Sequence, residues 1–215
     1  MIEIQASTQA DRTFNELLQA IVTGQILPGS RLREIELAKE MGIGRGPLRE
    51  ALNRLESRKL VTKVPHVGAQ VVGLDVTEVI EIYQLRENLE GLACELAATR
   101  MSQTQLDALA RLIEQHAQYL SDHDGQLYIE QEADLDFHFM IIQGSQNRWL
   151  IRLLCDELYH RVRMYRFQSA HNRGRPSQAL EDHKRILEAL QNRDGELASM
   201  LMKRHISAAR LLLEQ

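Results

Sequence analysis

The chain has 215 residues, of which 44% are hydrophobic and 5% aromatic, and its formal net charge is −4. This length and hydrophobic content allow one large or two small domains with ordinary cores. The few glycines and only four prolines favour a mainly helical protein. No apolar run is long enough to cross a bilayer, and the first residues lack the pattern of a signal peptide. We therefore expect a cytoplasmic protein with no membrane partner.

Positive charge concentrates in the first third of the chain. Residues 1–73 hold 10 Lys or Arg against 8 Asp or Glu, whereas residues 74–215 hold 16 against 22. Between Met41 and Pro65 the count is six basic against two acidic residues. A basic segment within an acidic chain indicates contact with nucleic-acid phosphates. We accordingly divide the chain into a DNA-binding domain, 1–73, and a second domain, 74–215.

A helix-turn-helix is the first motif along the chain. Apolar residues within 32–41 suit a short helix ended by Gly42, which can adopt the left-handed conformation that a tight turn needs. Leucines at helical spacing within 42–61 predict a second helix. Arg45 and Arg49 lie four residues apart at its N-terminal end, the end that a recognition helix presents to base edges in the major groove.

Two β-prone runs follow this helix. Leu60–Val64 and Ala69–Gly73 are separated by four residues that include a proline and a glycine, which predicts a hairpin. A helix-turn-helix followed by a hairpin is a winged helix. An isolated amphipathic helix with arginines is more often a solvated face, but here the turn, helix and wing occur in order, which favours DNA binding.

From residue 74 the pattern is helical almost to the end. The predicted helices lie near 77–100, 102–121, 126–144, 147–170, 177–193 and 195–214. Thr77 is the expected cap of the first, Ser102 and Gln105 form a capping box, and Asp194 is the expected cap of the last. The predicted fold class is mainly α, with an N-terminal winged helix-turn-helix followed by an all-α bundle domain of about six helices.

Polar side chains interrupt the apolar faces of three of these helices. Asp134 and His138 are four residues apart and project together, while His183 and His205 share faces with leucines in the last two helices. One carboxylate and three imidazoles suit a divalent transition metal: zinc, with nickel or manganese as alternatives. Taken singly, each histidine is more often a hydrogen-bonded core residue, and His116 lies on an apolar face in the same way.

Two arginines also break the amphipathic pattern. Arg86 lies on the inner face of its helix, where an internal ion pair with Glu90 or Glu87 is one interpretation. The other is a bidentate clamp for the carboxylate of a bound metabolite. Arg161 faces apolar residues in the same manner and is a second candidate for such a clamp.

These segments together resemble a known family of regulators. The resemblance rests on the motifs LPGSRLREIELAKEMGIGRGPLREALNRLESRKLV, the wing PHVGAQV, IYQLRENLEGLACELAA, DLDFHFMI, EDHKRILEAL and MLMKRHI. The chain is similar to GntR-family transcriptional regulators of the FadR subfamily, with an FCD-type C-terminal ligand-binding domain, from about Arg12 to Leu212. The resemblance implies a metal held by Asp134, His138, His183 and His205 at the floor of an effector pocket.

The resemblance also implies how DNA is bound. A homodimer would place two recognition helices on a palindromic operator in double-stranded DNA. The predicted DNA contacts are Arg33, Arg45, Pro47, Arg49, His66 and Gly68. The chain departs from the family in two places. Gly44 and Gly46 stand where many members have hydroxyl residues, and Ile35 stands where the fatty-acid regulator of the subfamily has arginine. Both departures concern the operator sequence.

The leading functional hypothesis is a dimeric transcription factor, expected to be a repressor, whose operator affinity is controlled by a small carboxylate metabolite. The four-ligand metal set argues against an acyl-CoA ligand. A direct metal sensor is one alternative, and a metal-dependent hydrolase is another. No convincing general base accompanies the metal ligands, and an enzyme would not explain the winged helix. We therefore predict that the chain is not an enzyme.

Overall fold

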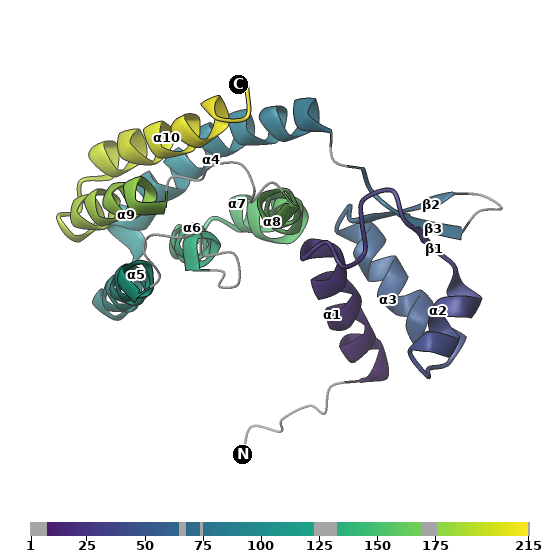
Figure 1. Ribbon diagram of the computed structural model, residues 1–215. Coiled ribbons are helices and arrows are strands. Elements are labelled where there is room, and N and C mark those ends of the chain that lie inside the picture. The colour runs from purple at the N-terminus through teal and green to yellow at the C-terminus, as the bar shows by residue number, and fades with distance from the viewer. Residues whose placement is uncertain (1–7, 65–67, 74, 123–132, 169–175, 215) are drawn as a thin grey trace, which may run out of the picture. The chain divides into compact units, whose positions relative to one another are not determined.

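A computed structural model of the chain describes residues 8–64, 68–73, 75–122, 133–168 and 176–214 (Figure 1). The chain divides into two compact units. The first comprises Met1–Leu74 with His160–Gln168, and the second comprises Asp75–Tyr159 with Ser169–Gln215. Among the described helices, none has both the length and the apolar content needed to span a membrane.

The first unit is a winged helix-turn-helix. Its elements are α1 (Gln9–Val22), β1 (Arg31–Leu32), α2 (Glu34–Glu40), α3 (Arg45–Ser57), β2 (Val61–Val64) and β3 (Gly68–Val71). The three strands form an antiparallel sheet in the order β1-β3-β2, and the hairpin register pairs Val64 with Gly68. The predicted helix-turn-helix and wing are confirmed. Helix α1 and strand β1 were not predicted.

Local capping explains where α1 begins. The Thr8 hydroxyl accepts from the Asp11 amide at 3.1 Å, and the Asp11 carboxylate accepts from the Thr8 amide at 3.0 Å. This is a capping box, which satisfies two amides that the first turn of a helix would leave without partners. The hydrogen bonds from Thr8, followed by that from Arg54, lower the pKa of Asp11 to about 2.

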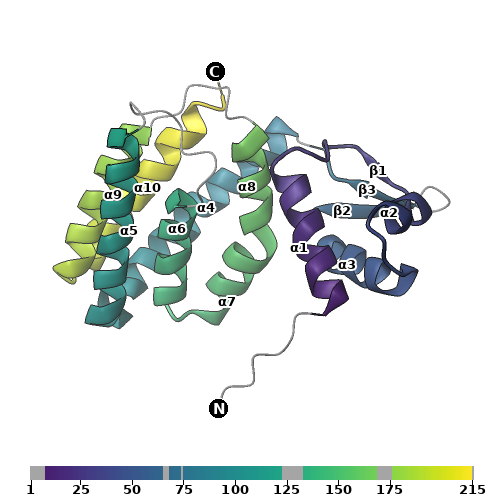
Figure 2. The same ribbon diagram turned by 60° about the horizontal axis from the view of Figure 1, so that its bottom comes forward.

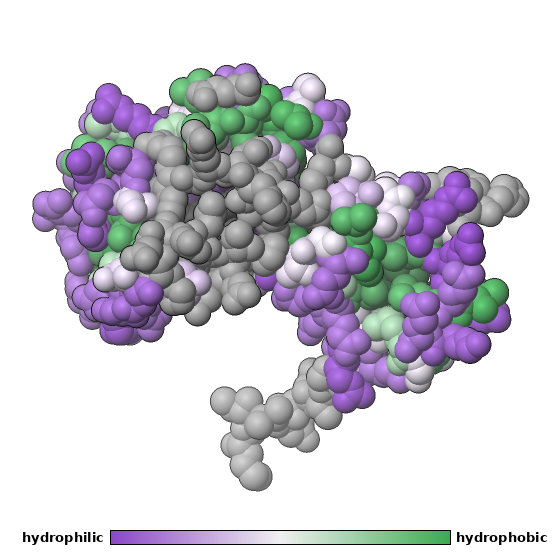
Figure 3. Space-filling view, viewed as in Figure 1, coloured by the Kyte–Doolittle hydropathy of each residue, from purple (hydrophilic) through white to green (hydrophobic). Residues whose placement is uncertain are grey.

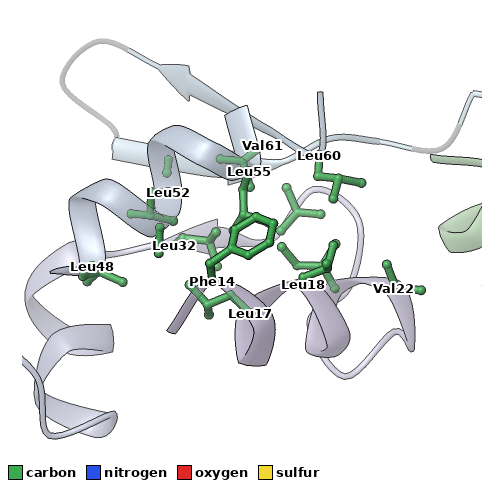
Figure 4. Close-up of a cluster of buried hydrophobic side chains, with 14 of the residues drawn as sticks. Phe14, Leu17, Leu18, Val22, Leu32, Leu48, Leu52, Leu55, Leu60 and Val61 are labelled. Carbon is green, nitrogen blue, oxygen red and sulfur yellow. The ribbon is translucent and has the colours of Figure 1, made fainter. Parts of the chain in front are cut away.

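Leucines of α3 and apolar side chains of α1 form the core of the first unit (Figure 4). The members drawn from these two helices include Phe14, Leu17, Leu18, Leu48, Leu52 and Leu55. The turn between α2 and α3 contains Gly42 at φ +63°, the left-handed conformation predicted from the sequence. Burial of one face of α3 leaves the opposite face at the surface of this unit.

The second unit is all helical (Figures 1 and 2). It contains α4 (Val76–Arg100), α5 (Gln103–Asp122), α6 (Ala133–Gly144), α7 (Arg148–Ile151), the π-helix η1 (Arg152–Leu158), α9 (Pro176–Gln191) and α10 (Gly195–Leu211). Helix α8 (Tyr159–Gln168) continues from η1, and all of it after Tyr159 belongs to the first unit. The predicted fold class is therefore confirmed, while the single helix expected over 147–170 is divided by a π-helix.

Two of the three predicted caps of the second unit are confirmed and one is corrected. Ser102 and Gln105 exchange the hydrogen bonds of a capping box, and the Asp194 carboxylate accepts from the Leu197 amide at 3.0 Å. Helix α4 is capped by Asp75, which accepts from the Thr77 amide at 2.9 Å. Thr77 therefore lies inside the first turn, because a carboxylate two residues earlier already satisfies its amide.

Helices α4 and α10 pack closely along their lengths, and Figure 2 shows the two lying side by side. A Cβ atom at Gly195 would lie 2.9 Å from the Glu95 carbonyl oxygen. A Cβ atom at Gly91 would lie 3.1 Å from the Ser199 hydroxyl oxygen. Hydrophobic residues also gather over the end of α10 and the start of α4 on the face shown in Figure 3, where Val76 and Leu211 are about half exposed.

Candidate metal centre and nucleic-acid interface

Three histidines from three helices meet inside the second unit. His138 lies on α6, His183 on α9 and His205 on α10, and one ring nitrogen of each lies within 4.8 Å of those of the other two. The ring centroids are 5.5 Å apart for His138 and His183, 5.2 Å for His138 and His205, and 4.8 Å for His183 and His205. His138 and His183 are buried and His205 is mostly buried. The structure thus brings together three of the four predicted metal ligands.

The fourth predicted ligand, Asp134, belongs to the same helix as His138. Its backbone lies in α6 one turn before His138, while its side chain lies outside the described ones. His116, on α5, is also buried, and its ring centroid lies 6.4 Å from that of His183. It is not among the three histidines whose nitrogens lie close together. The stacked ring of Phe137, with its centroid 3.8 Å away, packs against His183.

Carboxylates contact two of the three imidazoles at the same ring atom. Glu90 Oε2 lies 2.6 Å from His138 Nδ1, and Asp182 Oδ2 lies 3.3 Å from His205 Nδ1. An ionised carboxylate can only accept a hydrogen bond, so each Nδ1 is the protonated nitrogen. A neutral imidazole protonated at Nδ1 has its lone pair at Nε2, the form that binds a metal. The donor set therefore fits a divalent transition metal such as zinc.

Glu90 also pairs with Arg86. Its other oxygen, Oε1, lies 2.6 Å from Arg86 Nε, and both side chains are almost fully buried. Burial alone would raise the pKa of Glu90, but the positive charge of Arg86 and the contact with His138 outweigh it and lower the pKa to about 2. The ion pair with Glu90 that the sequence suggested for Arg86 is thus present, whereas Glu87 pairs with Arg210.

The contact between Glu90 and His138 was missed by sequence reasoning. The sequence indicated Glu90 only as an ion-pair partner of Arg86, which lies four residues before it on the same face of the helix. The available signal was that α4 carries an acid and a base together on its inner face. Arg161, the second candidate clamp, lies in the segment His160–Gln168 of the first unit, whereas Arg86 and the three histidines lie in the second.

The arginines of α3 fall into two groups. Arg45 and Arg49 lie in its first two turns and are exposed, and Arg49 Nε donates to Glu34 Oε2 at 2.7 Å. Arg54 instead donates to Asp11 at 2.7 Å and lies over the ring of Phe14. The exposed arginines, Arg45 and Arg49, thus lie at the N-terminal end of α3, while Arg54 contacts α1 and helps to pack α3 against it.

The other predicted DNA contacts lie in the same unit. Arg33 precedes α2 and forms an exposed pair with Glu36 at 2.9 Å. Pro47 is half-buried in the first turn of α3. Gly68 begins β3 at φ +100°, a conformation that glycine adopts without strain, and His66 lies outside the described residues.

The first unit is a winged helix with exposed arginines, and the second is a helical domain with an internal cluster of histidines. Together they define a two-part transcriptional regulator. Residues 9–71 match the family model described as bacterial regulatory proteins, gntR family, and residues 81–208 match that of the FCD domain. The chain therefore belongs to the GntR family and carries an FCD domain. This membership confirms the expected family and the prediction of a regulator rather than an enzyme.

Relatives cover nearly the whole chain. The uncharacterized HTH-type transcriptional regulator YdhC of Bacillus subtilis is 31% identical over 91% of this chain and 84% of its own length. The HTH-type transcriptional repressor GlaR of Escherichia coli is 29% identical over 94% of both proteins. The solved structure of E. coli McbR/YncC matches with a TM-score of 0.75 at 23% identity, covering 98% of this chain and 99% of that one, and so shows the same fold.

Proposed function

We propose that this chain is a repressor whose affinity for its operator is controlled by a small carboxylate bound beside a metal ion. One observation carries the proposal. The same chain contains a recognition helix with exposed arginines at its start and a buried cluster of three histidines. The name of GlaR supports repression as the mode of action. A protein that acts on the bacterial chromosome works in the cytoplasm.

The proposed DNA contacts follow from exposure and position. Arg45 and Arg49 would read guanine edges in the major groove, since two turns of helix at the N-terminal end reach the bases. The Glu34 carboxylate contacts Nε of Arg49, so the Nη nitrogens of Arg49 would meet the base. Arg33, Pro47, His66 and Gly68 would contact the backbone and the minor groove.

Replacing Arg45 or Arg49 by alanine should weaken binding to the specific operator by about 1–3 kcal/mol if the side chain reads a guanine. Binding to random DNA should weaken much less. Fluorescence anisotropy on an operator selected from random sequences by the wild type measures both affinities. Arg111→Ala, which removes the same charge from the exposed surface of α5, is the control. An equal loss on operator and random DNA would show that the arginines contact phosphates only.

The proposed metal is held by His138, His183 and His205 together with Asp134. Imidazole and carboxylate ligands suit zinc, with nickel or manganese as alternatives. His138 and His183 are buried and His205 is mostly buried, and one ring nitrogen of each lies within 4.8 Å of those of the other two, which is close enough for all three to bind one ion. When bound, the metal would supply a Lewis-acidic position that an effector oxygen can occupy.

His183→Ala and His205→Ala should each abolish the single divalent metal that the wild type binds per chain, because each removes a ligand. Elemental mass spectrometry after loading with zinc and desalting gives the stoichiometry. His116→Ala is the matched control, since His116 is equally buried next to His183 but is not one of the three grouped histidines. Retention of one metal per chain in both ligand variants would contradict the assignment.

A homodimer is part of the proposal, since two recognition helices would match a palindromic operator. Leu85 and Leu92, two turns apart on α4, are 52% and 40% exposed, and Trp149 on α7 is 75% exposed. A second copy of the chain would cover the side of α4 that carries Leu85 and Leu92. Sedimentation equilibrium should show a dimer that the double variant Leu85→Glu, Leu92→Glu dissociates, whereas Leu211→Glu does not. A monomeric wild type would contradict the proposal.

The proposed effector is a hydroxy acid, sugar acid or dicarboxylate bound between the metal and Arg86. A carboxylate of the effector would bind the guanidinium of Arg86, whose Nε donates to Glu90. Such a ligand changes operator affinity only by as much as it prefers one state of the protein, commonly about 1–3 kcal/mol. Arg161 remains the second proposed effector contact.

Calorimetry with a set of small organic acids tests the effector site. An acid that releases the operator should bind zinc-loaded wild type and bind much more weakly to the metal-stripped protein and to Arg86→Lys, which keeps the charge but loses the bidentate fork. Equal binding to all three proteins would contradict the site. If zinc alone changed operator affinity without any acid, the direct metal sensor would replace this proposal.

A further inference from the structure

The histidine cluster is flanked by two acids that are not among the proposed ligands. Glu90 approaches His138 from α4, and Asp182 approaches His205 from α9, the helix that also carries His183. Both contacts are made to Nδ1, although the two acids come from different helices. In both imidazoles, therefore, Nδ1 is a nitrogen that a carboxylate contacts.

We propose that Glu90 and Asp182 are positioning residues that fix the Nδ1-protonated form of His138 and His205, so that Nε2 faces the metal. A neutral imidazole carries one N–H, and the hydrogen bond made by one nitrogen decides which one carries it. Protonation at Nε2 would point an N–H at the centre and prevent coordination. This inference rests on the proposed metal site, to which it adds the residues that prepare the ligands.

The two acids should contribute unequally. Glu90 is 2% exposed, lies 2.6 Å from its histidine and is kept charged by Arg86. The Asp182 side chain is 21% exposed, and its contact of 3.3 Å is longer. A charged acceptor that is buried at short distance makes the stronger hydrogen bond, because water competes with it least. His138 should therefore be held more firmly than His205.

Replacement of Glu90 by glutamine removes the charge and offers an amide that can donate to Nδ1, which would move the imidazole proton to Nε2. Loss of such a partner of a metal-binding histidine commonly lowers metal affinity about 10- to 100-fold. We expect that loss for Glu90→Gln and a smaller one for Asp182→Asn. Glu87→Gln is the matched control, because Glu87 lies on the same helix and pairs with Arg210 rather than with a histidine.

Two measurements test the inference. The first is the nitrogen chemical shifts of the histidine rings in metal-free wild type, which should show His138 and His205 protonated at Nδ1. The second is zinc affinity by competition with a chromophoric chelator, for the wild type, Glu90→Gln, Asp182→Asn and Glu87→Gln. Because Asp182 is partly exposed, its variant should fold even if loss of the buried charge of Glu90 prevents folding.

The possible results distinguish the role of Glu90 and Asp182 from the existence of the metal site. A metal-free wild type with His138 protonated at Nε2 would overturn the inference, whatever the metal affinity. The inference would also be overturned if Glu90→Gln and Asp182→Asn bound zinc as tightly as the wild type and Glu87→Gln do. A wild type that binds no zinc at the histidines would overturn the proposed metal site and this inference with it, whereas the first two results would leave the metal site standing.

Discussion

Close packing of the first and last helices of the second unit is the constraint on which its interior depends. Small residues let the backbones of α4 and α10 approach, as Gly91 beside Ser199 and Gly195 beside the carbonyl of Glu95 show. This approach fixes His205 on α10 relative to Glu90 on α4. Helices α6 and α9 then bring His138 and His183 to the same place. A bulky residue along the seam would separate the helices and disperse the cluster, because packed interiors absorb little extra volume.

The second determining feature is the carboxylate of Glu90. A buried charge costs several kcal/mol unless it is paired and hydrogen-bonded, as Glu90 is by Arg86 on one oxygen and His138 on the other. Replacing all three residues with apolar ones of similar volume would remove that cost altogether. A buried arrangement of charges of this kind is therefore weak evidence for stability.

Much of this arrangement could be predicted from the sequence, and the reasons for the failures are specific. Caps such as Asp194 and the inward faces of His183 and His205 depend on spacing within one helix, which the sequence records directly. The contact of Glu90 with His138 joins residues 48 positions apart, and only tertiary packing brings them together. Helix α4 presents buried residues on several sides, so no single apolar stripe marks its inner face. The Thr8 and Asp11 pair did signal the start of α1 and was overlooked.

The π-helix between α7 and α8 has a consequence for chain length. Inserting one residue into an α-helix would turn everything beyond it by about 100°, since 3.6 residues complete a turn. A segment with i→i+5 hydrogen bonds accommodates an extra residue locally, so the helices on both sides keep their faces. Arg152–Leu158 is such a segment, with Leu154 and Cys155 buried. Insertions and deletions of a single residue should therefore be tolerated here during divergence, whereas the same change within α4 would misalign its contacts with α10.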